Sequence, residues 1–288
     1  MSTIMFGDPG SPVDTEDAYV PTSDRSIWRS GPVVILLRLL LIALVLVLWQ
    51  VLSGPVLPTY AVSTPTEVAK TLGSLLSSSS GWSNIETTSV EVVVGFVLGV
   101  AIGTLMALVL GTFSLAGRVM EPLVAAFNGI PKIAIAPLFV LFFGIGEWSK
   151  IAIAITGVAF VVFYNLYLGL REVKRELREI VQVMGGKPHH VLRYVTLPTL
   201  LSPFFAGLKA GGPLAILGVI GGEFIASFNG VGHLLFTYST DLDAAGVFAA
   251  LVILVAMSLI INGLLSQLDR FAMRRLGLAA HLDTQQRA

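Results

Sequence analysis

The chain has 288 residues, of which 55% are hydrophobic and 12% are charged, and its mean hydropathy is +0.83. This composition excludes a single water-soluble core and, without the alternating pattern of a membrane barrel, predicts an all-α polytopic membrane protein. Basic and acidic residues number 18 each and cysteine is absent, so neither a nucleic-acid partner nor disulfides and thiolate metal sites are expected.

Residues 1–30 are polar and rather acidic and show no apolar periodicity, so we expect a disordered cytoplasmic tail. A secretory signal peptide would begin with basic residues and continue into an apolar stretch. Acidic residues stand there instead, namely Asp8, Asp14, Glu16 and Asp17.

Six apolar segments between residues 31 and 270 are long enough to cross a bilayer, which needs about 20 apolar residues per helix. They predict a domain of six transmembrane helices, followed by a cytoplasmic tail at 271–288. The predicted spans are 33–52, 89–111, 122–145, 151–170, 199–222 and 244–266.

The polar stretch 53–88 contains two patterns typical of a helix start. In each, a hydroxyl residue precedes a glutamate by three positions, as in a capping box. The pairs are Thr64 with Glu67 and Ser83 with Glu86. The first predicts an amphipathic helix at the outer surface.

Small residues recur every four positions in the second predicted span, and such a stripe lets another helix approach closely. Intrachain packing is the favoured interpretation, and a dimer face or the wall of a pathway between the spans is the alternative. The residues are Gly95, Gly99, Gly103, Ala107 and Gly111.

Two lysines lie within predicted spans, where a cation is costly and suggests function. Lys132 stands between Pro131 and Pro137, and either faces an anionic solute in the pathway or pairs with a buried carboxylate or backbone carbonyls. Lys209 either snorkels to the surface or lines the pathway. Glu223, near the outer end of the same span, is expected to have a hydrogen-bonded structural role.

Residues 171–198 form a strongly charged stretch between two apolar spans. Gly185 and Gly186 predict a turn that ends a first helix, and Pro188 predicts the start of a second. Pro198 marks the entry into the next apolar run. The first helix is amphipathic, with one apolar face made of Val173, Leu177, Ile180, Val181 and Met184.

Lys and Arg are distributed unequally between the predicted loops, with thirteen on one side of the membrane and two, Lys70 and Lys150, on the other. The basic side is the cytoplasmic one, so both termini and residues 171–198 are expected in the cytoplasm. The thirteen are Arg25, Arg29, Arg118, Arg171, Lys174, Arg175, Arg178, Lys187, Arg193, Arg270, Arg274, Arg275 and Arg287.

The spacing of Glu179, Gly185, Leu197 and Pro198 resembles the cytoplasmic E-A-A-x3-G-x9-I-x-L-P signature of bacterial ABC-importer permeases. Ile180 and Val181 replace its alanines, and Val195 replaces its isoleucine. The strings at 130–150 and 221–235 are similar to those of the nitrate, sulfonate and taurine branch, which includes thiamine- and riboflavin-precursor relatives. The resemblance covers residues 60–270.

This resemblance implies a permease subunit of the bacterial inner membrane that forms the pathway for a small solute by alternating access. The solute would be a sulfonate-, taurine- or nitrate-like anion or a vitamin precursor. Implied partners are a cytoplasmic ATP-binding subunit that receives Glu179 and Gly185, an extracytoplasmic solute-binding protein, and a second copy or paralogue. No cofactor is implied.

Two alternatives come from other classes of protein. A secondary transporter would need ion-coupling carboxylates within its spans, and the predicted spans contain almost none. A membrane-embedded enzyme would need clustered polar residues at one depth. The sequence has no H-E-x-x-H motif and no G-x4-G-K-[ST] phosphate loop, so we expect no catalytic metal and no ATP hydrolysis by this chain itself.

Overall fold

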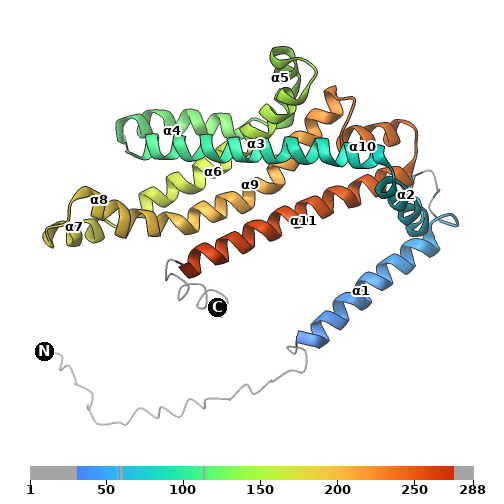
Figure 1. Ribbon diagram of the computed structural model, residues 1–288, viewed down its shortest axis with the longest axis horizontal. Coiled ribbons are helices and arrows are strands. Elements are labelled where there is room, and N and C mark those ends of the chain that lie inside the picture. Colours follow the sequence, from blue (N-terminus) through green and yellow to red (C-terminus); the bar gives the residue numbers. More distant parts are fainter. Residues whose placement is uncertain (1–30, 57, 59–60, 113, 276–288) are drawn as a thin grey trace, which may run out of the picture. The chain divides into compact units, whose positions relative to one another are not determined.

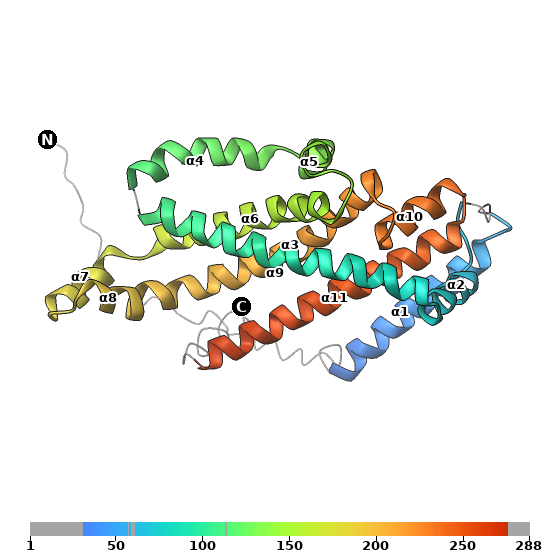
Figure 2. The same ribbon diagram turned by 45° about the horizontal axis from the view of Figure 1, so that its top comes forward.

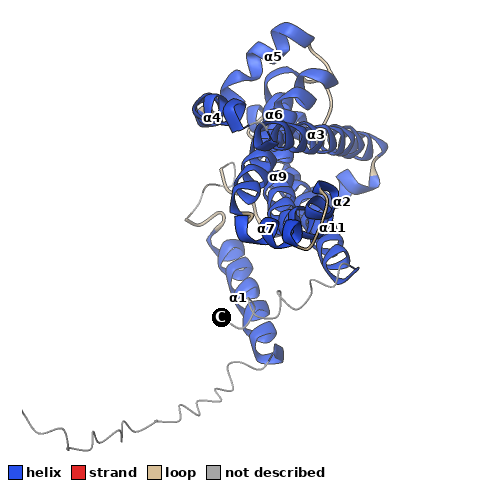
Figure 3. Ribbon diagram, turned by 90° about the vertical axis from the view of Figure 1, so that its left-hand side faces the viewer, coloured by secondary structure: helices blue, strands red, loops and turns tan. Residues whose placement is uncertain are grey.

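The computed structural model describes residues 31–275 with the exception of 57, 59, 60 and 113. The tail predicted at 1–30 and the residues from 276 onward lie outside the described residues. Within the described part, the regular elements are helices (Figure 3). The all-α prediction is therefore confirmed, and the last helix continues to Arg275, beyond the predicted end of the domain at residue 270.

Five helices in the described part of the chain are long and apolar enough to cross a membrane. They are α1 (Gly31–Leu52), α3 (Ser79–Thr112), α6 (Glu147–Glu172), α9 (Leu197–Ala226) and α11 (Ala244–Arg275). Shorter elements connect them: α2 (Pro65–Ser77), α4 (Ser114–Gly129), η2 (Lys132–Ile135), α5 (Ala136–Phe143), α7 (Arg175–Val183), α8 (Pro188–Val191), η3 (Leu192–Thr196) and α10 (Val231–Thr240).

Among the described residues, those up to Leu48 form one compact unit and those from Trp49 onward form another. The first unit contributes most of α1, which matches the first predicted span. The second unit contains the helix bundle described below, in which α3, α6 and α9 lie side by side (Figure 1).

The glycine stripe of α3 packs against α6. A Cβ atom on Gly95 would lie 2.7 Å from Ala154 Cβ, and one on Gly99 would lie 2.6 Å from Val158 Cβ. Small residues allow this close approach, and close packing holds helices together in a bilayer. The favoured interpretation of the stripe, intrachain packing, is therefore confirmed, and the successive contacts show that α3 and α6 run parallel.

Helix α9 runs antiparallel to α6. Its glycines face α6 in reverse order, since Gly207 lies against Val162 and Gly218 lies against Ala154. The helix continues through prolines at 203 and 213, although each proline lacks the N–H of a regular helical hydrogen bond. The closely packed surfaces of α3, α6 and α9 thus form the centre of the second unit.

The predicted third span, 122–145, is not one continuous helix, which corrects the prediction. The chain forms α4, leaves helical geometry before Pro131, and continues as η2 and α5 (Figure 2). Proline lacks a backbone donor and disfavours helical geometry at the preceding residue, which explains the break. Because α3 and α6 are parallel, the segment between them must return along the bundle, and we call this segment the broken third crossing.

The two predicted helix starts in 53–88 have different outcomes. Thr64 caps α2, since its hydroxyl accepts a hydrogen bond from the Glu67 backbone N–H at 3.2 Å. The start predicted at Ser83 is wrong, because α3 begins at Ser79 and its first turn is capped by Ser78, whose hydroxyl accepts from Gly81 N–H. Helix α3 is therefore longer than its apolar part.

Candidate functional site

Residues 171–198 form the predicted helix, turn and second helix, which we call the coupling loop. Gly185 has a φ of 78°, a left-handed conformation that glycine adopts without a steric penalty. Its N–H donates to Gln182 O, and Gly186 N–H donates to Val181 O, as in a Schellman motif. The turn joins α7 to α8, which continues through η3 into α9.

Helix α7 exposes much of its apolar side. Leu177 and Ile180 are 44% and 54% exposed, and Val183 and Met184 are 88% and 82% exposed. We call these four residues the docking face. Val173, by contrast, is buried. Burying one such side chain stabilises an association by about 1.5–3 kcal/mol, so this face is suited to contact another protein.

The motif residues lie at both ends of the coupling loop. Glu179 lies on α7 and pairs with Arg175, with 2.7 Å between Oε1 and Nε. Leu197 and Pro198 begin α9. Because Pro198 has no N–H to continue the regular ladder, the preceding turn widens into the π-helical η3.

Lys132 lines a cavity of about 510 Å³ between the broken third crossing and helices α6 and α9. Its Nζ donates to Phe127 O at 3.3 Å and to Ile130 O at 3.0 Å, and lies 5.1 Å from the centre of the Phe160 ring. The other lining residues are mostly apolar: Ile130, Pro131, Ile133, Ile153, Gly157, Val161, Tyr164, Leu214, Leu217 and Gly218.

Lys209, the second predicted pathway residue, forms an ion pair with Asp269 of α11, with 2.5 Å between Nζ and Oδ2. The lysine side chain is 40% exposed and the aspartate side chain is 12% exposed. The pair connects α9 to α11 in a part of the bundle separate from the Lys132 cavity.

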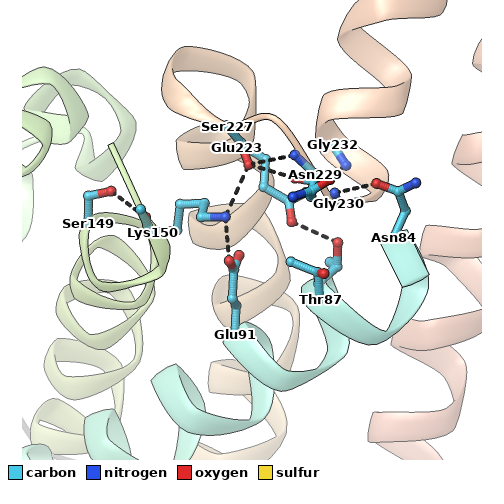
Figure 4. Close-up of polar contacts among 12 residues, drawn as sticks. Asn84, Thr87, Glu91, Ser149, Lys150, Glu223, Ser227, Asn229, Gly230 and Gly232 are labelled. Carbon is cyan, nitrogen blue, oxygen red and sulfur yellow. Dashed lines mark hydrogen bonds and ion pairs between the residues drawn. The ribbon is translucent and has the colours of Figure 1, made fainter. Parts of the chain in front are cut away.

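A buried charge cluster lies at the end of the bundle opposite the coupling loop. Lys150 of α6 forms an ion pair with Glu91 of α3, and its Nζ donates to Ser227 Oγ at 3.1 Å (Figure 4). Glu223 of α9 is also close enough to interact electrostatically with Lys150. Lys150 is 3% exposed and both glutamates are 1% exposed.

The cluster continues through hydrogen bonds into the loop between α9 and α10. Glu223 accepts from the Thr88 hydroxyl at 2.7 Å and from Gly232 N–H at 2.6 Å. Asn84 of α3 accepts from Gly230 N–H at 2.6 Å. The prediction that Glu223 has a hydrogen-bonded role is therefore confirmed, and its partners come from α3 and α10.

Sequence reasoning missed Glu91 and placed Lys150 in a solvated outer loop. It also undercounted the carboxylates within the spans. Both residues stand at the edges of predicted spans, where a charge is ordinarily solvated. The available signal was that Glu91, Lys150 and Glu223 fall at the same predicted end of three different spans.

The fold defines a multi-span helical membrane protein with an exposed helical loop between α6 and α9. The family described as "Binding-protein-dependent transport system inner membrane component" matches residues 99–274, which is more than half of the chain. The chain therefore belongs to this family.

Two relatives extend the match over most of the chain. The riboflavin transport system permease protein RibX of Chloroflexus aurantiacus is 31% identical over 266 residues, covering 91% of this chain and 97% of the relative. The putative aliphatic sulfonates transport permease protein SsuC of Bacillus subtilis is 28% identical over 251 residues, covering 87% and 88%.

An inward-facing structure of the MetNI methionine ABC transporter also resembles this chain. It matches with a TM-score of 0.52 and 23% sequence identity, covering 66% of this chain and 92% of the matched chain. At this identity the likeness shows the fold alone.

The chain is a transmembrane pathway subunit of an ABC importer, which makes it a transporter component rather than an enzyme. The alternatives of a secondary transporter and a membrane-embedded enzyme are set aside. The family generally implies an ATP-binding subunit and a solute-binding protein as partners.

Proposed function

We propose that the coupling loop docks onto the ATP-binding subunit and conveys its movements to α6 and α9. The observation that carries this proposal is the docking face, four exposed apolar side chains on a helix whose backbone is fixed by the turn at Gly185. Since the loop joins the ends of α6 and α9, a displacement of α7 acts on both helices. In this proposal Glu179 is a contact position and Gly185 holds the turn between α7 and α8, while Leu197 and Pro198 anchor the exit of the loop into α9.

The proposed orientation places both termini and the coupling loop in the cytoplasm of a bacterial cell, with the buried charge cluster at the outer end of the bundle. The excess of Lys and Arg on the side of the coupling loop supports this orientation. A solute-binding protein would then approach the outer end, near α2 and the loop that precedes α10.

The proposed pathway passes the Lys132 cavity. A lysine ammonium among mostly apolar walls suits a small anion that carries an apolar part, such as an aliphatic sulfonate. The sulfonate relative supports this solute class, and the riboflavin relative keeps a vitamin precursor as the second candidate. For Lys209, the ion pair with Asp269 supports a structural tie between α9 and α11 in preference to solute contact.

The complete pathway is proposed to form between two permease chains, either two copies of this chain or this chain and a paralogue. Binding of ATP by the partner subunits would draw the coupling loops together and open the cavity outward, and hydrolysis would return it inward. No ATP chemistry is assigned to this chain.

Site-directed crosslinking tests the docking step directly, because the chain contains no cysteine and each introduced cysteine reacts alone. V183C in the docking face should crosslink to the ATP-binding subunit and should be labelled only from the cytoplasmic side. F228C, at an exposed position beyond α9, should be labelled only from outside. The proposal would be overturned if V183C were labelled from outside and F228C from the cytoplasmic side. It would also be overturned if V183C never crosslinked to a nucleotide-hydrolysing partner.

Reconstituted vesicles test the transport step. Vesicles that contain the chain with its ATP-binding subunit and its solute-binding protein should take up one solute from a panel of ethanesulfonate, taurine, nitrate and riboflavin. Uptake should occur only when ATP is present on the side of the membrane to which the coupling loop is exposed. V183D should abolish uptake by preventing docking, while Q182A, at an exposed position of α7 that points away from the docking face, should not. Uptake that continues without ATP contradicts the assignment.

A further inference from the structure

The coupling loop and the buried charge cluster lie at opposite ends of the same two helices. Helix α6 runs from Glu147 near the cluster to Glu172 at the loop, and α9 returns from Leu197 to Ala226. At about 1.5 Å per residue, Lys150 lies about 33 Å from the end of α6. Movement of the loop therefore reaches the outer end only if these helices remain joined there.

The cluster supplies this joint from three helices. Lys150 belongs to α6, Glu91 to α3, and Glu223 to the last turns of α9. Ser227, which accepts from Lys150, is the residue at which α9 ends. Separating any of these helices would leave a buried charge without its partner, which is strongly unfavourable.

The same cluster fixes the beginning of α10. The Val231 and Gly232 N–H groups donate to Thr88 Oγ1 and Glu223 Oε2, at 2.8 and 2.6 Å. Gly230 has a φ of 108°, and a Cβ atom there would collide with the Glu223 carboxylate. The loop between α9 and α10 is therefore held by α3 and α9 together (Figure 4).

We propose that Glu91, Lys150 and Glu223 are positioning residues for transport. They make the outer ends of α3, α6 and α9 and the start of α10 move as one body, so that displacement of the coupling loop reaches the outer face. This inference rests on the proposed function of the coupling loop. The three residues act through helix positions and not by contact with the solute.

Spin labels at S83C and F228C test the joint in the assembled complex. Both positions are exposed, and they lie on α3 and on the loop after α9. In the otherwise unchanged chain, the distance distribution should be narrow and the same without nucleotide and with ATP plus vanadate. K150M should broaden the distance distribution and make it depend on nucleotide. K70M, the same substitution in the exposed ion pair with Glu67, should leave the distribution unchanged.

ATP hydrolysis tests the consequence for coupling. K150M should reduce stimulation by the solute-binding protein about tenfold, within the range of allosteric coupling energies, with basal hydrolysis and crosslinking of V183C retained. The K150M/E91Q double variant removes one charge of each sign and should recover part of the stimulation. If K150M does not reach the membrane, E91Q alone provides the test, with the same broadening and loss expected.

The two proposals fail separately. If the solute-binding protein does not stimulate ATP hydrolysis by the unmodified complex, and V183C never crosslinks to the ATP-binding subunit, the coupling function itself is overturned. If the unmodified complex is coupled and K150M or E91Q keeps both the narrow distances and full stimulation, only the positioning role is overturned. A loss in K150M that the double variant does not relieve at all also contradicts the charge-balance argument.

Discussion

Glu179 and Arg175 form an ion pair along α7, and Val183 lies one further turn along the same side of the helix. At about 100° per residue, this places the Glu179 carboxylate at the edge of the docking face, beside its most exposed valine. The glutamate is thus placed to form polar contacts at the rim of an apolar interface.

We expect E179A to weaken capture of the ATP-binding subunit about tenfold, equivalent to about 1.4 kcal/mol. Folding should be unaffected, since an exposed ion pair of this kind contributes at most about 1 kcal/mol. Co-purification at several partner concentrations measures the loss, with Q182A as the control, because Gln182 is exposed on α7 and points further away from the docking face than Glu179 does. Equal capture by E179A and the unmodified chain would exclude a contact role for Glu179.

Gly185 is expected to tolerate alanine poorly. Its left-handed backbone costs an L-residue about 1–2 kcal/mol, so G185A should loosen the turn between α7 and α8. Amide hydrogen exchange of α7 should become faster, and uptake per ATP hydrolysed should fall. G73A is the matched control, because a Cβ atom on Gly73 meets nothing within 4 Å. If G185A exchanges as slowly as the unmodified chain, the turn does not set the position of α7.

The sequence predicted features that depend on local pattern. Long apolar runs located the spanning helices, and two glycines followed by a proline located the turn of the coupling loop, because these residues determine backbone geometry within a few positions. Even the glycine stripe of α3 was interpreted correctly, since close approach requires small residues wherever the neighbour lies.

Features that depend on distant segments were missed. Whether Lys150 is solvated or buried depends on Glu91 and Ser227, which lie 59 and 77 positions away, and no local pattern records such a partner. The broken third crossing was missed for a different reason. The apolar residues from 122 to 145 were interpreted as one continuous helix, although Pro131 disfavours helical geometry at the residue before it.

Lys132 is expected to affect solute affinity more than turnover. K132M should raise the KM for a transported anion about tenfold, because it removes the ammonium from an otherwise mostly apolar cavity. K132R keeps the positive charge and should retain most of the affinity. Initial uptake rates over a range of solute concentrations separate KM from maximal rate. Unchanged kinetics in K132M would exclude solute contact and leave the lysine a structural role, to which its hydrogen bonds with the Phe127 and Ile130 carbonyls contribute.

Gly103 tests whether the α3 stripe sets the stability of the bundle. A Cβ atom there would collide with the Ala159 backbone of α6, so G103A should separate the two helices slightly and cost about 1–3 kcal/mol. G263A introduces the same methyl group on α11, where nothing lies within 4 Å, and should leave stability unchanged or raise it slightly. Thermal unfolding in detergent should therefore occur at lower temperature for G103A than for G263A. Equal unfolding temperatures would mean that α6 can move aside freely, in conflict with the close packing of α3 on α6.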